Sequence, residues 1–245
     1  MQPMQVELVV FDVAGTTVVD DDHVARALRS SLADVGVTVS ERACARVMGL
    51  AKPVALEALA AGQVEAHALA GVVLEGHRIF VERMIHHYLA SPGVRAVPGA
   101  ETTFQSLREE GIAIALDTGF SRPILDAILL RLGWHEEVID ISVASDEVEA
   151  GRPHPFMIRR AMSAVQVTSA ARVIKVGDTP ADMREGVAAG AGSVVGVLSG
   201  TGTRDDLSEA GATHILADVS ALPRLVFGTP RRSPSVLLRD RLFSA

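Results

Sequence analysis

Cysteine, aromatic residues and lysine are all scarce in this chain of 245 residues, and each scarcity limits the structures or functions that the protein can have. The single cysteine, Cys44, cannot form a disulfide within the chain, which fits a reducing cytoplasm. We expect it to be a small core residue on a helix. Aromatic residues make up 4% of the chain and hydrophobic residues 48%, so a core would be built from Val, Leu, Ile and Ala.

Long hydrophobic runs and concentrated positive charge are also missing. No apolar stretch is long enough to span a bilayer, and no signal peptide precedes the first predicted strand. The formal net charge is −7, and the one basic run is PRRSP near the C-terminus. A nucleic-acid groove would need a concentrated positive stripe. The sequence therefore predicts a cytoplasmic protein whose partners include neither a membrane nor a nucleic acid.

Lysine is the rarest charged residue, because two lysines stand against 21 arginines. In a chain that prefers Arg so strongly, Lys52 and Lys175 are candidates for a chemical requirement. Lys175 lies within a predicted strand, and we interpret it as a structural residue rather than a nucleophile. Lys52 lies in a predicted helical region and is considered below.

Short apolar runs alternate with stretches of helical periodicity over most of the chain. The predicted strands are Glu7–Phe11, Ile112–Leu116, Val138–Val143, Val173–Val176, Val194–Val197 and His214–Leu216. The amphipathic stretches are Ala100–Glu110, Arg122–Arg131, Pro155–Val165 and Ala181–Ala189. Nearly continuous aliphatic strands are typical of a parallel sheet buried on both faces. The pattern predicts an α/β fold with a doubly wound, Rossmann-like sheet, whose chemistry lies at the carboxyl ends of the strands.

Residues 20–97 break this alternation, because they contain no clear strand. The predicted helices there are Asp22–Val35, Glu41–Met48, Pro53–Ala61 and Glu65–Leu89. We interpret this part as an all-helical cap inserted after the first strand. Residues 1–19 and 98–226 would then form the core, and residues 227–245 a C-terminal tail.

Polar residues stand at the predicted carboxyl ends of several strands. They are Asp12 in FDVAGTT, Thr118 and Gly119 in ALDTGF, Arg152 in EAGRPHP, and Asp178 and Asp182 in KVGDTPADM. Each has a simpler interpretation as a helix cap or a turn residue. In a doubly wound sheet, however, they can converge on one crevice, and this makes a shared site the stronger interpretation.

The chemistry of such a site follows from its residue types. Asp12 would be a carboxylate nucleophile for a phosphoryl group. Thr118 and the amide of Gly119 would hold phosphoryl oxygens, and Arg152 would supply fixed positive charge to the transition state. Asp178, helped by Asp182 four residues later, would bind a hard cation.

The order of these motifs resembles the haloacid dehalogenase superfamily of phosphoryl-transfer hydrolases, from Glu7 to about Val226. Within it, DxAGTT and an Arg before the last motif resemble the phosphonatase branch, which includes phosphonoacetaldehyde hydrolase. Ala14 and Arg152 match these two features. The resemblance implies an aspartyl-phosphate at Asp12, and Mg²⁺ held by Asp12, the Ala14 carbonyl, Asp178 and Asp182.

The segment VMGLAKPVAL resembles the MGLxK motif of the same branch. There the lysine forms a Schiff base with the substrate aldehyde, so that an enamine leaves when the C–P bond breaks. The resemblance assigns this role to Lys52, and it places Met48 and Gly49 against the substrate. Without the motif, Lys52 would be interpreted as an exposed residue at the start of a cap helix.

The sequence also departs from that branch. Ala55, Asp22 and Phe120 stand where the branch has His, Cys and Tyr, and Phe120 is still expected beside the substrate. The linker DDDHV places Asp20, Asp21 and Asp22 near the expected entrance of the site. These acids repel a simple dianion, favour a cationic or amino-bearing substrate, or only cap the next helix, and we favour the last interpretation.

Three functions therefore remain open. The first is Mg²⁺-dependent cleavage of the C–P bond of phosphonoacetaldehyde or a close analogue. The second is hydrolysis of a small phosphate ester or anhydride, with Lys52 serving only specificity. The third is a catalytically weak binding or regulatory protein on the same fold. All three imply a small phosphonate or phosphorylated partner, and the family resemblance is compatible with a homodimer formed through the cap.

Overall fold

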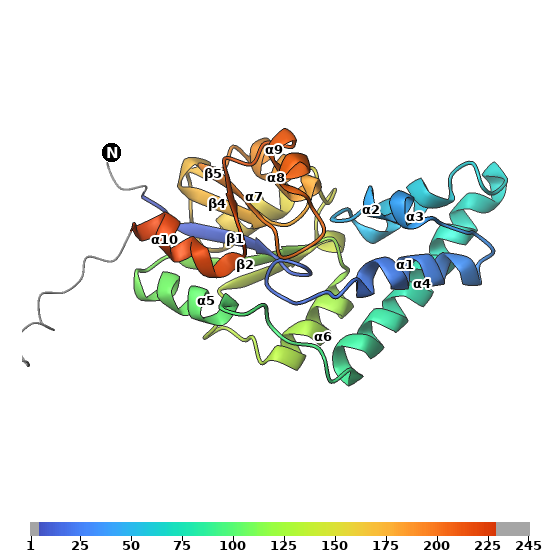
Figure 1. The fold of residues 1–245 in the computed structure, drawn as a ribbon, viewed down its shortest axis with the longest axis horizontal. Coiled ribbons are helices and arrows are strands. Elements are labelled where there is room, and N and C mark those ends of the chain that lie inside the picture. Colours follow the sequence, from blue (N-terminus) through green and yellow to red (C-terminus); the bar gives the residue numbers. More distant parts are fainter. Residues whose placement is uncertain (1–4, 229–245) are drawn as a thin grey trace, which may run out of the picture.

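A six-stranded parallel sheet forms the centre of the computed structural model, which describes residues 5–228 (Figure 1). The strands are β1 (Leu8–Asp12), β2 (Ala113–Thr118), β3 (Ile141–Ala144), β4 (Val173–Gly177), β5 (Ser193–Val197) and β6 (His214–Leu216). Their order in the sheet is β3-β2-β1-β4-β5-β6. The order reverses beside β1, and such a switch point opens a crevice at the carboxyl ends of the adjoining strands.

Helices cover both faces of this sheet. They are α5 (Ala100–Glu109), α6 (Arg122–Leu132), α7 (Phe156–Ala164), α8 (Pro180–Ala189), α9 (Arg204–Glu209) and α10 (Leu222–Phe227). Side chains of β1 alternate between the two layers: Val9 and Phe11 join the cluster that includes α5 and α6, while Leu8 and Val10 join the cluster around α7. Both faces of β1 are therefore buried, which accounts for its unbroken apolar run.

The structure confirms the predicted α/β class and corrects one strand. The run Val138–Val143 was expected to be strand throughout, but β3 begins only at Ile141. Val138 and Ile139 belong to a turn instead, because the N–H groups of both donate to the His135 carbonyl. At Asp140, where pairing with β2 begins, the side-chain Oδ2 accepts the Ile114 N–H at 2.7 Å in place of a backbone carbonyl.

Four helices form the cap between β1 and α5. They are α1 (His23–Asp34), α2 (Glu41–Ala45), α3 (Lys52–Ala60) and α4 (Ala66–Ala90). They extend to one side of the sheet, and α4 runs back along the cap to contact α6 of the core (Figure 1). Tyr88 of α4 packs edge-on against Phe120, with ring centroids 6.0 Å apart, so cap and core share one apolar cluster.

The two linkers of the cap pair with each other. The Val19 N–H donates to the Arg95 carbonyl at 3.1 Å, and the Val97 N–H donates to the Thr17 carbonyl at 2.8 Å. The cap therefore leaves and re-enters the core through adjacent strands of backbone. The domain boundaries at 19/20 and 97/98 stay predictions, and the tail predicted at 227–245 lies almost entirely outside the described residues.

Two smaller expectations concern the cap. Cys44 is buried in α2, as expected for a core residue. The helix predicted to reach Met48 ends at Ala45, because the following turn leads to Gly49 with a φ of +83°, outside the helical region. Among the helices of residues 5–228, none combines the length and apolar character that a membrane span requires.

Candidate active site

A small cavity of about 20 Å³ lies where the carboxyl ends of β1, β2 and β4 meet the cap. Nearly all the residues predicted from the sequence line it: Asp12, Ala14, Met48, Gly49, Lys52, Thr118, Gly119, Phe120, Arg152 and Asp178. Asp182 does not. This volume holds little more than one water molecule, so a substrate enters only when the cap moves away.

Asp12 is the last residue of β1 and is buried at the floor of the cavity. Its Oδ1 accepts a hydrogen bond from Arg152 Nη1 at 2.7 Å. Burial raises the pKa of Asp12 to about 6, against the lowering effect of Arg152. The carboxylate is therefore mostly ionised at neutral pH, and it is held by one partner on one oxygen.

The guanidinium of Arg152 is fixed from three sides. Its Nε donates to Glu185 Oε2 at 2.9 Å, its Nη1 donates to Asp12, and its Nη2 donates to Asp117. Only 3% of Arg152 is exposed. A planar guanidinium bound on several edges cannot rotate, so its charge stays directed at the cavity floor.

Lys175 completes this network behind Arg152. Its Nζ forms ion pairs with Asp117, with Asp182 Oδ1 at 3.1 Å and with Glu185 Oε2 at 3.2 Å. Lys175 is fully buried in β4. The expectation that it is structural agrees with this position, because its amine is surrounded by carboxylates and does not line the cavity.

Sequence reasoning missed two members of the network, Asp117 and Glu185. A signal for Asp117 was available, since an acid inside the apolar run IALDT needs a cation, and Lys175 interrupts another strand in the same way. Glu185 lies on α8 with nothing in the sequence to set it apart, and only its position against β4 brings it to Arg152.

Asp178 is the residue best suited to a divalent cation. It is 1% exposed, and no Lys or Arg among residues 5–228 forms an ion pair with it. Its Oδ1 accepts from the Thr16 hydroxyl at 3.1 Å, and its Oδ2 accepts from the Thr201 N–H at 2.8 Å. Burial, and then the charge of Asp12, raise the pKa of Asp178 well above its usual value.

These observations fit a hard metal ion such as Mg²⁺. Two buried carboxylates, Asp12 and Asp178, face one cavity together with Ala14, and one of the carboxylates lacks a cation. Carboxylate and carbonyl oxygens are the ligands that Mg²⁺ prefers. The donor set therefore suits the ion that the motifs imply.

Asp182, predicted to help with the metal, is engaged elsewhere. Its Oδ2 accepts from the Thr179 hydroxyl at 2.5 Å and from the Thr179 N–H at 3.2 Å, which caps α8. Its Oδ1 lies 3.1 Å from both Arg152 Nη1 and Lys175 Nζ. Asp12, Asp117 and Asp182 do have oxygens within 4.8 Å of one another, but these two side-chain cations already occupy that space. We therefore leave Asp182 out of the metal set.

Lys52 is not the exposed lysine that its helix position alone would suggest. It is 3% exposed, and it lines the same cavity as Asp12. Its Nζ donates to the Leu50 carbonyl at 3.2 Å and lies 5.2 Å from the centre of the Phe120 ring. Burial is the main cause that lowers the pKa of Lys52, to about 8; Asp12 acts in the opposite direction.

The segment that carries Lys52 fits tightly against the core. The Lys52 N–H donates to the Gly119 carbonyl at 3.1 Å. A Cβ on Gly119 would lie 2.4 Å from the Leu50 carbonyl oxygen, and one on Gly49 would lie 2.2 Å from Thr179 Oγ1. Only glycine permits these approaches, so the MGLAK segment is fitted to the DTG turn at Gly119 and to Thr179 at Gly49. Thr118, beside this turn, is also buried.

Comparison with known proteins agrees with this geometry. The model of the haloacid dehalogenase-like hydrolases matches residues 6–190. This chain belongs to that family. This haloacid dehalogenase-like hydrolase is 30% identical over 233 residues to phosphonoacetaldehyde hydrolase of Bacillus cereus. The matched region covers 86% of this chain and 80% of the relative. It is 38% identical over 105 residues to the enzyme of the same name from Parabacteroides distasonis, covering 43% and 39% of the two chains.

The fold of this haloacid dehalogenase-like hydrolase also resembles solved structures. A phosphonoacetaldehyde hydrolase-like protein from Oleispira antarctica has a TM-score of 0.77 at 20% identity, covering 92% of this chain and 95% of that one. A hydrolase from Pseudomonas syringae has a TM-score of 0.76 at 21% identity, covering 89% and 97%. These likenesses bear on the fold, and they support the α/β core with its helical insertion.

Proposed function

We propose that this hydrolase cleaves the C–P bond of phosphonoacetaldehyde or a close analogue. The observation that carries the proposal is the placement of Lys52. A buried amine with a pKa of about 8 lines the same small cavity as the carboxylate of Asp12. An amine that is partly neutral near pH 7 can attack an aldehyde, whereas hydrolysis of a phosphate ester at Asp12 needs no amine nucleophile.

The proposed reaction joins the two groups in sequence. Lys52 Nζ adds to the aldehyde carbon, and water leaves as the protonated imine forms. A carboxylate oxygen of Asp12 then attacks phosphorus, and the electron pair of the C–P bond moves into the imine to give an enamine. Water hydrolyses the aspartyl-phosphate, and inorganic phosphate leaves. A proton from solvent adds to the enamine carbon, and a further water releases acetaldehyde and the free amine.

The remaining residues hold the phosphoryl group and its charge. Arg152 stabilises negative charge as the phosphorus centre becomes trigonal, and its fixed guanidinium needs no reorganisation for this. Thr118 and the amide of Gly119 would bind phosphoryl oxygens. Asp12, Asp178 and the carbonyl of Ala14 would hold Mg²⁺, whose charge lets the anionic nucleophile and substrate approach each other.

Ala14 is consistent with this chemistry. It stands where most phosphatases of this superfamily have an acid that protonates the leaving alcohol, and a methyl group cannot do so. General acid catalysis is worth about 10²–10⁴ in rate, so a poor alcohol leaving group would react slowly here. An enamine needs no protonation at the moment when the C–P bond breaks.

The test is to trap the imine. The protein is incubated with phosphonoacetaldehyde and Mg²⁺, reduced with borohydride and digested for mass spectrometry. Because the chain contains two lysines, an adduct can form only at Lys52, Lys175 or the N-terminal amine. We expect the adduct at Lys52, together with release of inorganic phosphate. EDTA should stop phosphate release, and added Mg²⁺ should restore it.

A matched variant separates this proposal from a phosphatase. Lys52→Arg keeps the positive charge but cannot form an imine, so phosphate release from phosphonoacetaldehyde should be lost while 4-nitrophenyl phosphate is still hydrolysed. Absence of any adduct and of phosphate release in the wild type, with hydrolysis of 4-nitrophenyl phosphate intact, would contradict the proposal. That result would identify a phosphatase for esters with good leaving groups, for which Asp12, Arg152 and Asp178 suffice.

A further inference from the structure

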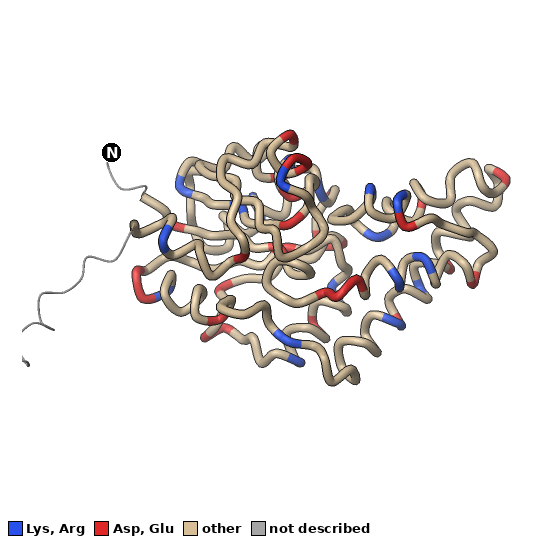
Figure 2. The backbone as a smooth tube through the Cα atoms, viewed as in Figure 1, with Lys and Arg blue, Asp and Glu red and all other residues tan. Residues whose placement is uncertain are grey.

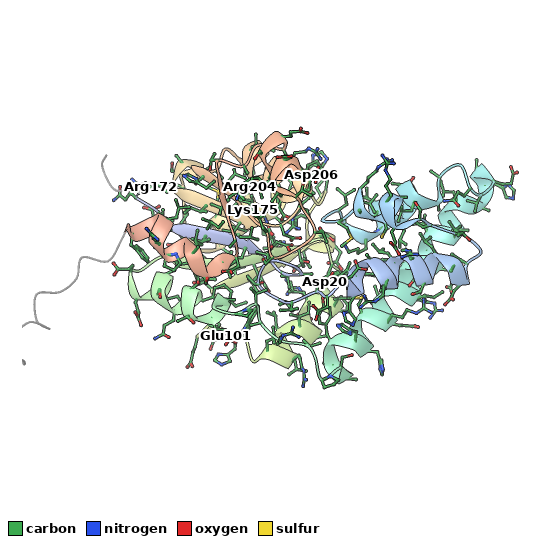
Figure 3. All side chains as sticks on the ribbon, in the orientation of Figure 1. Asp20, Glu101, Arg172, Lys175, Arg204 and Asp206 are labelled. Carbon is green, nitrogen blue, oxygen red and sulfur yellow. The ribbon has the colours of Figure 1, made fainter. Side chains whose placement is uncertain are left out.

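A third carboxylate, Asp20, lines the cavity together with Lys52 and Asp12. It belongs to the linker between β1 and α1, and Figure 3 shows it where the core meets the cap. The acidic stretch of this linker is visible as a continuous red segment at the same junction (Figure 2). The side chain therefore reaches the cavity from the linker, and not from the strand ends or from α3.

Asp20 does cap α1, as the sequence suggested for this linker, but capping uses only part of the side chain. Its Oδ1 accepts the Val24 N–H at 3.0 Å. His23 Nδ1 contacts the backbone oxygen of Asp20 at 2.8 Å rather than its carboxylate. Among residues 5–228, no hydrogen bond to Asp20 Oδ2 is present, so one carboxylate oxygen is left for another task.

The other carboxylates of the cavity have other tasks. Within the described part of the chain, Asp12 keeps one oxygen free beside Arg152, but the proposed reaction uses it as the nucleophile, and both oxygens of Asp178 accept hydrogen bonds from threonines. The residues that follow Lys52 on α3 are Pro53, Val54 and Ala55, none of which is ionisable. Among the described residues that line this cavity, Asp20 is therefore the one carboxylate with a free oxygen that the proposed reaction does not already use.

Imine chemistry at Lys52 needs such a group. Water leaves the carbinolamine only after its hydroxyl has gained a proton, and hydrolysis of the imine needs a base that removes a proton from water. Burial raises the pKa of Asp20, against the Val24 N–H, His23 and Lys52, which lower it; Asp22 adds to the rise. A carboxyl in this setting holds its proton more readily than one in water.

We propose that Asp20 is the acid–base residue for imine formation and hydrolysis at Lys52, an inference that rests on the proposed function. As the carbinolamine collapses, the carboxyl of Asp20 gives its proton to the hydroxyl, the C–O bond breaks and water leaves. The imine is left protonated and Asp20 ionised. In the hydrolytic step Asp20 takes a proton from the attacking water, which returns the carboxyl to its starting form.

The test compares two activities of the same variant. Asp20→Asn keeps an oxygen that can accept the Val24 N–H, so α1 stays capped while the proton is lost. The readout is the rate of borohydride-trapped adduct at Lys52 divided by the rate of 4-nitrophenyl phosphate hydrolysis. We expect this ratio to fall about 100-fold in Asp20→Asn, the scale of general acid–base catalysis. Asp20→Glu should recover part of it.

The neighbouring acid provides the matched control. Asp21 is exposed and lies 3.6 Å from Arg95, so Asp21→Asn removes the same charge from the same linker and should leave the ratio unchanged. If the wild type is trapped and Asp20→Asn is trapped at the same ratio, Asp20 is only a helix cap and this inference fails alone. If the wild type gives no adduct, the proposed function fails and Asp20 loses its role with it.

Discussion

The two lysines of this protein lie on two sides of one active-site region and differ in the charges around them. Lys175 of β4 belongs to the side formed by the core, here called the core wall, and Lys52 of α3 belongs to the side formed by the cap, here called the cap wall. In the core wall, Lys175 Nζ forms ion pairs with Asp117, Asp182 and Glu185, and although burial lowers the pKa, these carboxylates raise it above the ordinary value. In the cap wall, Lys52 Nζ has the Leu50 carbonyl and the Phe120 ring beside it, and burial lowers its pKa to about 8.

Both lysines are almost fully buried, so burial alone does not explain the difference. What separates them is the presence or absence of carboxylates in direct contact. The core wall compensates its charges and fixes Arg152, which suits a site that must bind a phosphoryl group. The cap wall leaves an amine poorly solvated and weakly paired, which is the condition for a nucleophile.

The largest effect should come from Asp12, which lies at the floor of the cavity. Asp12→Asn removes the nucleophile and should lower hydrolysis of phosphonoacetaldehyde and of 4-nitrophenyl phosphate by about 10⁴-fold or more. Because the buried carboxylate becomes a neutral amide of the same shape, circular dichroism should show an intact fold. Equal turnover in variant and wild type would mean that neither reaction passes through Asp12.

Replacing each lysine by methionine tests the comparison directly. Lys175→Met leaves buried carboxylates without their partner and should lower the free energy of unfolding by about 3–5 kcal/mol. Lys52→Met removes a poorly compensated charge and should raise it by about 2–3 kcal/mol at pH 7, since one pKa unit corresponds to about 1.4 kcal/mol. Denaturant unfolding measures both, and two changes of the same sign would contradict the contrast.

The gain from Lys52→Met should also depend on pH. The folded-state pKa of Lys52 is about 8 and its model value is 10.5, so the unfolded chain binds more protons between these values. Wild-type stability contributed by this group therefore rises with pH over that interval, and the advantage of Lys52→Met should shrink there and vanish above about pH 10.5. A constant difference between pH 7 and pH 10.5 would argue against a depressed pKa.

The same pKa predicts that the reactivity of the Lys52 amine depends on pH. In Asp20→Asn, where no Asp20 proton titrates, adduct formation at Lys52 should rise about tenfold per pH unit below pH 8, as the neutral amine becomes available, and level off above it. Initial trapping rates between pH 6 and pH 9 measure this. A rate that still climbs at pH 9 would indicate an amine with an ordinary pKa.

The smallest effect is expected at Glu185 in the core wall, at acidic pH. Burial raises its pKa from 4.5 to about 8, so at pH 4 the carboxyl is protonated in the folded and the unfolded chain and resembles the amide of Glu185→Gln. Stability from this group falls as pH rises from the unfolded to the folded pKa. The variant should therefore match the wild type within about 0.5 kcal/mol at pH 4 and be the more stable of the two at pH 9. Thermal unfolding at the two pH values would detect the difference.

The strand-and-helix pattern could be predicted because aliphatic runs and helical periodicity are local properties. β6 was predicted at its observed bounds, and β1 within one residue at each end. β3 was predicted to begin three residues too early, because Val138 and Ile139 belong to a turn closed on His135 and the Asp140 side chain accepts a backbone amide of β2. Asp12, Arg152 and Asp178 could be found because their short motifs follow strands.

By itself the sequence determined the fold class, the family and most residues of the cavity, since motifs at strand ends converge in any doubly wound sheet. The tertiary structure decided how those residues are charged. It buried Lys52 beside Phe120, turned Asp182 toward Arg152 and Lys175, and brought Glu185 and Asp20 to the site. These assignments depend on distances across the cap–core seam and between helix and sheet, because solvation and ion pairing are set by neighbours in space.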